Sequence, residues 1–255
     1  MFGLELFAVL ALVSLLAGTL IGTIGIGGIL LIPALAYFAQ FTTRVAMATA
    51  LFSFIFTGVT GTYLYQSRRS IDWRITVPVC SGAFCFSYLG ALVNSMVNTT
   101  VLNLALAGVI TFAGAFTLRP FHGREFVFEH KNPLHLVMLV LIGATVGFMS
   151  GLTGTGGPVL SVPLMVIAGF PPLTSIATSQ VIQIAAAVSG TIGNMANGAI
   201  DFGVAAWVTV MELVGVMVGV RIAHAAASHQ LRRSVAIMCL VVGVVLLFRH
   251  SGLME

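Results

Sequence analysis

Charged residues are scarce in this chain of 255 residues. Asp, Glu, Lys and Arg together make up 7% of the sequence, whereas 58% of the residues are hydrophobic. A soluble domain carries about 25% charged residues, so this chain has too few to cover a surface in contact with water. The scarcity excludes a soluble globular protein and indicates an integral membrane protein. The net charge of +4 then reflects basic loops rather than a surface for nucleic acid.

Cysteine and histidine are also few, and they are poorly placed for chemistry. Cys80, Cys85 and Cys239 lie within apolar segments and have neither metal-ligand spacing nor the pattern of a disulfide framework. The six histidines lie in loops or at segment ends: His122, His130, His135, His224, His229 and His250. An intramembrane enzyme needs a catalytic set inside the apolar segments. We therefore expect no enzyme, no bound metal and no cofactor.

Glycine, in contrast, is abundant, and one glycine stretch occurs twice. Five glycines recur 129 positions later, namely Gly18, Gly22, Gly25, Gly27 and Gly28 as Gly147, Gly151, Gly154, Gly156 and Gly157. The same offset relates Thr49 to Thr178 and Asp72 to Asp201. The chain is therefore predicted to be a duplication: a first transmembrane repeat at 1–118, a cytoplasmic linker at 119–133 and a second transmembrane repeat at 134–255.

Each repeat contains about five apolar segments. They are expected at 2–21, 24–40, 44–65, 75–96, 99–118, 134–151, 155–170, 174–197, 203–222 and 232–249. A helix needs about 20 residues to cross the hydrocarbon core. The segments 24–40 and 155–170 are the shortest, and each begins inside a glycine stretch. The predicted fold is an all-α integral membrane protein, with either eight spanning helices and two short re-entrant segments or ten crossings.

Loop charges predict how the repeats are oriented. The loop after the third segment holds Arg68, Arg69 and Arg74, and its counterpart in the second repeat holds no base. The next pair of loops reverses this asymmetry, since only the second repeat has arginines there: Arg221, Arg232 and Arg233. Cytoplasmic loops collect Lys and Arg. Equivalent loops therefore lie on opposite sides of the membrane, and the two repeats are predicted to be inverted.

Inverted repeats with paired, interrupted segments are typical of secondary transporters, whose site lies at the repeat interface. Glycine breaks a helix, and the next helix begins with free N–H groups and the positive end of its dipole, which bind an anion. Pro158 suits the first turn of such a helix, although the first copy has Ile29 there. We expect backbone N–H donors at Gly25, Gly27, Gly28, Gly154, Gly156 and Gly157. The alternative is that these glycines, like Gly18 and Gly22, only permit close helix packing.

Hydroxyl and amide side chains near the breaks form a second set of candidates. The expected side-chain donors to the anion are Thr23, Thr49, Thr153, Thr155, Thr178, Ser179, Gln180 and Gln183. Alternatively, such groups bond their own helix or a neighbouring helix. Glu212 is the one acidic residue deep inside a predicted spanning segment. A carboxyl there is costly and suggests proton coupling, the alternative being a neutral Glu bonded to a neighbouring helix.

The glycine motifs also carry a resemblance. Gly25-Ile26-Gly27-Gly28 with Pro33 and Ala48-Thr49, and Gly154-Thr155-Gly156-Gly157 with Pro163 and Ala177-Thr178-Ser179, resemble the TauE/SafE family of sulfite exporters over essentially the whole chain. The resemblance implies a multi-pass protein of the cell inner membrane that exports sulfite or an organosulfonate by alternating access. An anion channel or uniporter of the same architecture is the alternative, since flux rate separates the two. The expected partners are a small anion and the lipid bilayer, with a proton and a second copy of the chain left open.

Overall fold

The computed structural model describes residues 4–94, 107, 108, 111, 115, 133–153, 157–195 and 200–250. All regular structure in these residues is α-helical, as predicted. The helices, with α5 left out of the description, are α1 (Leu4–Ile24), α2 (Gly28–Phe38), α3 (Thr43–Ser67), α4 (Trp73–Asn94), α6 (Pro133–Thr153), α7 (Pro158–Ile167), α8 (Pro172–Met195), α9 (Phe202–Ala225) and α10 (Ser228–His250). The predicted segment 99–118 lies almost wholly outside the described residues.

Six of these helices are long and apolar enough to cross a membrane, judged by length and composition: α1, α3, α4, α6, α8 and α9. Their bounds agree with the predicted segments to within three residues at each end. The chain is therefore a multi-pass helical membrane protein.

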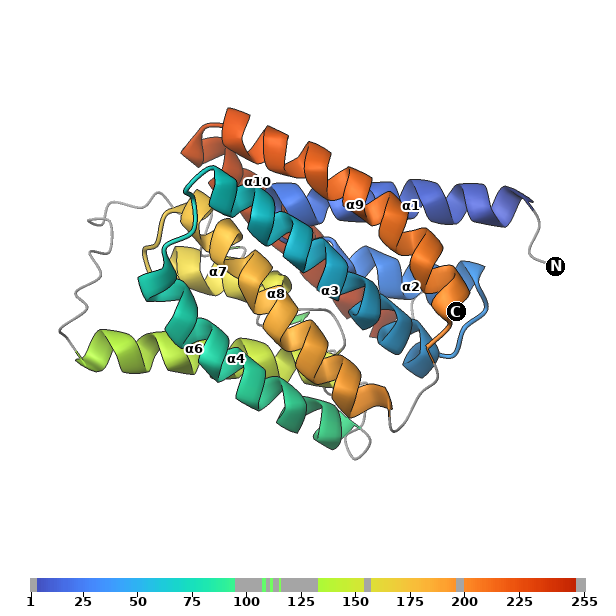
Figure 1. The fold of residues 1–255 in the computed structure, drawn as a ribbon, viewed down its shortest axis with the longest axis horizontal. Coiled ribbons are helices and arrows are strands. Elements are labelled where there is room, and N and C mark those ends of the chain that lie inside the picture. Colours follow the sequence, from blue (N-terminus) through green and yellow to red (C-terminus); the bar gives the residue numbers. More distant parts are fainter. Residues whose placement is uncertain are drawn as a thin grey trace.

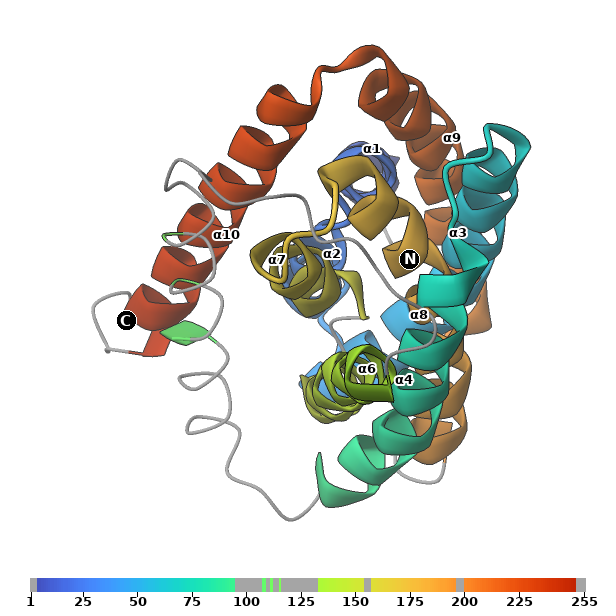
Figure 2. The same cartoon turned by 90° about the vertical axis from the view of Figure 1, so that its left-hand side faces the viewer.

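The helices that follow the glycine stretches are short. α2 has 11 residues and α7 has 10, which gives lengths of about 17 Å and 15 Å at 1.5 Å per residue. The hydrocarbon core is about 30 Å thick, so neither helix can cross it alone. Both begin later than predicted, at residues 28 and 158 rather than 24 and 155, because the glycine break takes up the first residues of each segment. Seen end-on, α2 and α7 lie near the middle of the molecule, and α10 stands apart on one side (Figure 2).

The long helices pair tightly across the sequence. α1 packs along α9, and α4 packs along α6, while α3 and α8 lie against each other between these pairs (Figure 1). Glycine permits the closest of these contacts. A Cβ at Gly18 would collide with the carbonyl of Glu212, and one at Gly147 would collide with the carbonyl of Ala83. The predicted packing role of Gly18 is thereby confirmed, and the same holds for Gly22, Gly147 and Gly151, which lie against the backbone of Val216, Ala83 and Ser87 respectively.

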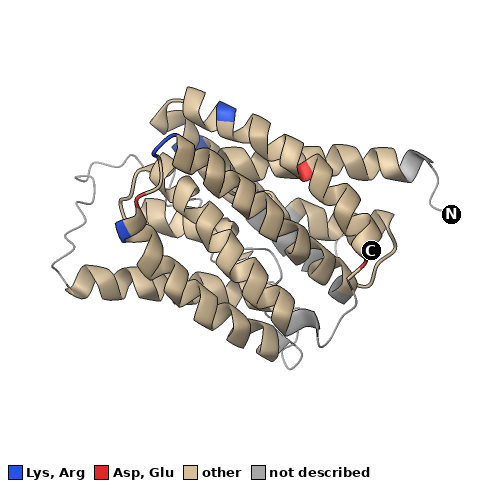
Figure 3. Cartoon of the chain, viewed as in Figure 1, with Lys and Arg blue, Asp and Glu red and all other residues tan. Residues whose placement is uncertain are grey.

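The two ends of the described part of the molecule differ in how many arginines they carry. α1, α3 and α9 begin at the right-hand end of Figure 1, whereas α4, α6 and α8 begin at the left-hand end. The left-hand end carries the arginines of the α3–α4 turn, the last turns of α9 and the start of α10, and Figure 3 shows the basic residues gathered there. We call it the basic end; its arginines are Arg68, Arg69, Arg74, Arg221, Arg232 and Arg233.

Candidate functional site

The first glycine break ends α1 by a change in backbone conformation. Gly25 has φ +77°, a left-handed value that side chains disfavour, and its N–H still bonds the carbonyl of Ile21 at 3.0 Å. α2 then begins after Gly27, which makes no side-chain cap bond. The first N–H groups of a helix have no intrahelical partner. The break therefore presents backbone donors and the positive end of a helix dipole.

The second glycine stretch is also followed by a helix without a side-chain cap, but this helix begins with a proline. α7 begins at Pro158 after Gly157, again without a side-chain cap bond. The N–H of Ser161 bonds the carbonyl of Gly157 at 3.2 Å, so the helix is regular from its first turn. Of the other predicted donors in this stretch, Gly154, Thr155 and Gly156 lie outside the described residues.

The two breaks meet inside the molecule. A Cβ placed on Gly25 would lie 3.4 Å from Cβ of Pro158 and 3.0 Å from Oγ of Ser179. From this point α2 leads toward one end of the molecule and α7 toward the other (Figure 1). The starts of two half-length helices, one from each predicted repeat, therefore converge beside α8.

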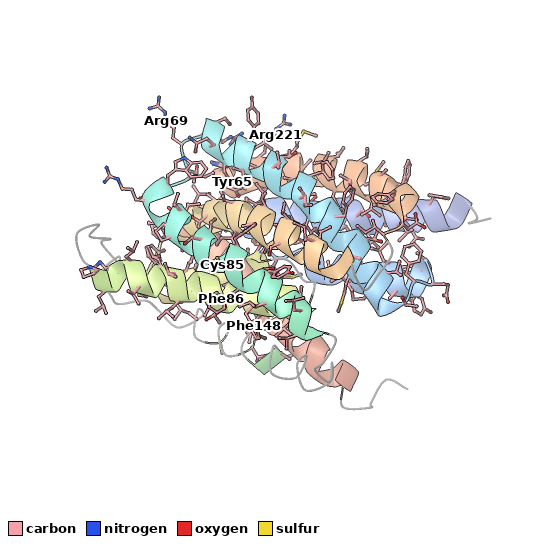
Figure 4. The ribbon with its side chains drawn as sticks, turned by 60° about the horizontal axis from the view of Figure 1, so that its bottom comes forward. Tyr65, Arg69, Cys85, Phe86, Phe148 and Arg221 are labelled. Carbon is pink, nitrogen blue, oxygen red and sulfur yellow. The ribbon has the colours of Figure 1, made fainter. Side chains whose placement is uncertain are left out.

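Three side chains hold the last turn of α1, just before its break. The hydroxyl of Tyr65 donates to the carbonyl of Gly22 at 2.7 Å, and Nε2 of Gln180 donates to the carbonyl of Ile21 at 3.0 Å. The hydroxyl of Thr23 is 2.7 Å from the carbonyl of Thr19 and 3.2 Å from that of Gly219. Tyr65, which points inward beneath the basic end (Figure 4), was missed by sequence reasoning, because an aromatic residue in an apolar helix gives no signal of a polar task.

The polar face of α8 is buried against the first half of the chain. Thr178 and Thr76 of α4 share a hydroxyl–hydroxyl bond of 3.0 Å. Nε2 of Gln183 donates to the carbonyl of Phe54 at 3.1 Å and to the hydroxyl of Thr57 at 2.8 Å. These α8 side chains are at most 1% exposed. They join helices of the two predicted repeats, which is the alternative role considered for them from the sequence.

The remaining predicted hydroxyls bond to backbone groups. Ser179 donates to the carbonyl of Ile176 at 2.7 Å, and Thr153 donates to that of Met149 at 2.7 Å. Thr49 accepts the N–H of Asp201 at 3.3 Å. The hydroxyl hydrogens of Ser179 and Thr153 are therefore already donated to the backbone of their own helices.

Glu212 lies on α9 and is fully buried. Neither of its carboxyl oxygens has a hydrogen-bond partner among the described residues. The hydroxyl of Ser53 of α3 is the polar side-chain group close to this carboxyl, but it donates to the carbonyl of Ala50 at 2.9 Å. A buried carboxyl without partners is costly when ionised. Elsewhere in the described part of the chain, no group of three His, Cys, Asp or Glu side chains could hold a metal ion.

The fold combines long apolar helices with two short helices, each of which follows a glycine break. This combination is typical of helical membrane proteins of the transporter type. Comparison with known proteins gives the family. The family model of the sulfite exporter TauE/SafE matches residues 10–246, and the chain belongs to this family.

Relatives from bacteria and archaea agree with this assignment. The probable membrane transporter protein YunE of Bacillus subtilis is 28% identical over 236 residues, which cover 82% of this chain and 83% of the relative. YdhB of the same organism, also named a probable membrane transporter protein, is 26% identical over 93% of this chain and 98% of its own length. The probable membrane transporter protein MJ0441 of Methanocaldococcus jannaschii is 26% identical over 69% of this chain and 67% of the relative. No solved structure matches the chain.

Proposed function

We propose that this protein is a secondary transporter that exports a small oxyanion, sulfite or an organosulfonate, across the cell inner membrane by alternating access. The observation that carries the proposal is the meeting of two uncapped helix starts, where Gly25 lies against Pro158 and Ser179. A negatively charged group with several oxygens fits such a point, since it accepts from backbone N–H groups and is stabilised by both helix dipoles.

Matched contacts in the two halves support an origin from inverted repeats. Gly18 against Glu212 and Gly147 against Ala83 are equivalent contacts, because both partners differ by 129 positions. The helices that contain the two glycines, α1 and α6, begin at opposite ends of the molecule (Figure 1). Two halves of opposite direction that pack on each other in the same way suit a carrier that exposes its central site to one side and then to the other.

The distribution of positive charge supports an anion bound by backbone groups. The arginines Arg68, Arg69, Arg74, Arg221, Arg232 and Arg233 lie in the turns and helix ends at the basic end, and none of them is buried (Figure 3). Binding by N–H groups avoids a buried cation, whose desolvation would be costly. The basic end faces the cytoplasm under this proposal, since loops on that side collect Lys and Arg.

Glu212 is the group we propose for proton coupling. The carboxyl is buried without a hydrogen-bond partner, so its neutral form is favoured until the surroundings change. The backbone of Glu212 lies against Gly18, seven residues before the break in the same helix α1. Protonation or deprotonation of Glu212 therefore acts on the contact between α9 and α1, the helix that ends at the first glycine break.

Flux measurements on the purified protein in liposomes test the function. We expect saturable sulfite flux that responds to an imposed pH gradient, with sulfoacetate and sulfate as competing anions. Gly157→Val places a side chain against Ile182 at the start of α7 and should abolish this flux. Gly203→Val, at an exposed position at the start of α9, is the matched control and should keep it.

Two results would contradict the proposal. Absence of flux for every small oxyanion would remove the function, and a Gly157→Val protein that folds and transports normally would remove the site. Flux that never saturates would favour a channel over a carrier.

A further inference from the structure

The interface between α4 and α8 contains a line of polar groups that leads to the glycine break from the basic end. Its outer part is an open depression of about 670 Å³ between the α3–α4 turn and the start of α8. Residues that line it include Arg69, Asp72, Trp73, Arg74 and Thr174. Because two of these residues are basic and one is acidic, the depression has a net positive charge.

Hydroxyl groups continue this line into the membrane. Thr174 lies one turn before Thr178 on α8, and Arg74 lies two residues before Thr76 on α4. Thr76 and Thr178 are fully buried and in contact at 3.0 Å. The next residue of α8, Ser179, lies against Gly25. The Thr76–Thr178 contact therefore stands between the depression and the two converging helix starts.

We propose that the anion passes between α4 and α8, with the depression as its first binding site and the Thr76–Thr178 contact as the barrier of this half of the route. The proposal rests on the proposed transport function and adds a path and a gate to it. Arg69 extends away from the helices at this end (Figure 4), and its charge attracts anions toward the depression. Asp72 opposes this attraction only in part, because the depression has one acidic residue against two basic ones.

The counterpart of Thr178 in the other half of the molecule also makes a contact between helices, but with a different partner. The positions 129 residues away from Thr178 and Asp72 are Thr49 and Asp201, whereas that of Thr76 is Ala205, which has no hydroxyl. Thr49 of α3 accepts the N–H of Asp201, the residue just before α9, at 3.3 Å. The two threonines lie at equivalent positions in the interfaces α4–α8 and α3–α9. A barrier at each end of the route is what alternating access requires, because only one of the two opens at a time.

Accessibility of a cysteine at position 178 tests the route without relying on transport. Cys80, Cys85 and Cys239 are first replaced by Ser, and Thr178→Cys is then treated from the basic end with an anionic methanethiosulfonate reagent. Ser14→Cys is the matched control, because Ser14 is equally buried but lies on α1. We expect modification at position 178 to be about tenfold faster than at position 14, since the reaction depends on access, and to be slowed by sulfate or sulfoacetate. Equal rates at the two positions would overturn the route.

A reversible cross-link tests the barrier. The double variant Thr76→Cys with Thr178→Cys brings two thiols to a spacing that a disulfide can bridge with a small shift. Oxidation should stop anion flux, reduction should restore it, and either single variant should be insensitive. Full flux through the oxidised protein would overturn the barrier and leave the transport function intact. If position 178 is labelled faster than position 14 but no anion is transported, the transport function is overturned. The accessible path between α4 and α8 is then retained.

A binding measurement distinguishes a free anion from a lipid phosphate at the first site. In a Trp207→Phe background, Trp73 is the remaining tryptophan and reports on the depression that it lines. We expect sulfate to change its fluorescence saturably in phosphatidylcholine nanodiscs, and Arg74→Gln but not Arg221→Gln to remove the change. A response to phosphatidylglycerol in the nanodisc, with none to sulfate, would assign the depression to lipid and overturn the first binding site.

Discussion

The starts of α2 and α7 follow matching glycine stretches but differ in the described residues that lead into them. Gly25 lies in the left-handed region, and three side chains hold the turn of α1 before it. Gly157, the counterpart of Gly28, has φ −54° and ψ −34°, which are helical values, and Pro158 follows as the first residue of α7. Gly154, the counterpart of Gly25, lies outside the described residues. The first break therefore depends on a conformation that glycine allows, and the second start depends on a proline that favours a helix start.

Two of the side chains that hold the first break have no matching residue at the offset of 129 positions. The positions equivalent to Tyr65 and Gln180 are Asn194 and Leu51, and Leu51 is a buried apolar residue. The repeated glycine pattern thus indicates where the breaks lie, and the side chains of Tyr65 and Gln180 hold the first. This difference predicts that the first break is the more sensitive to substitution.

The largest effect is expected for Gly25→Ala. A left-handed residue with a side chain costs about 1–2 kcal/mol, and the added Cβ would approach Cγ2 of Val162 at 2.8 Å. We expect loss of transport and a lower melting temperature in detergent. Gly157→Ala is the comparison, because its helical φ accepts alanine and only the approach to Cγ2 of Ile182 at 2.7 Å opposes the substitution. Equal losses in the two variants would show that the breaks are held alike.

The next effect concerns Glu212, whose counterpart is Ala83. Glu212→Gln keeps the shape of the side chain and removes its proton exchange. We expect sulfite flux to lose its response to an imposed pH gradient, while flux driven by the sulfite gradient alone remains. A coupling of about 1–3 kcal/mol corresponds to a five- to 150-fold change in the gradient response. An unaltered response would assign coupling to another group.

Much of this architecture could be predicted from the sequence because it depends on composition and on a glycine pattern that recurs at one offset. Apolar length placed α3 within two residues of its observed ends, and the glycine offset located both breaks. The limits of α2 and α7 were predicted too long, since hydropathy does not distinguish an apolar break from an apolar helix. Tyr65 and Thr76 escaped prediction because their roles come from partners 43 and 102 positions away. Such pairings depend on how helices are arranged, which a single sequence does not encode in its periodicity.

A smaller effect is expected where the two helix starts differ in one N–H group. Ile29 is the counterpart of Pro158 and contributes a first-turn N–H that proline lacks. Ile29→Pro should leave α2 formed, because proline is tolerated in the first turn. If this N–H binds the anion, the KM for sulfite should rise by up to about tenfold, the value of one hydrogen bond of about 1 kcal/mol or slightly more. The converse variant Pro158→Ala is the control and should not raise KM.

The smallest effect is expected for Tyr65→Phe, which removes only the hydroxyl that donates to Gly22 at 2.7 Å. The ring stays packed against His224, with centroids 5.0 Å apart, so the cost should be near that of one buried hydrogen bond, about 1 kcal/mol. Thermal unfolding in detergent measures it. Gln183→Leu, which removes the bonds from α8 to Phe54 and Thr57, should destabilise the protein at least as much but slow transport less, because those bonds lie away from the break. Tyr65→Phe could instead impair both transport and stability less than Gln183→Leu. In that case helix packing fixes the last turn of α1, and the hydrogen bond of Tyr65 adds little.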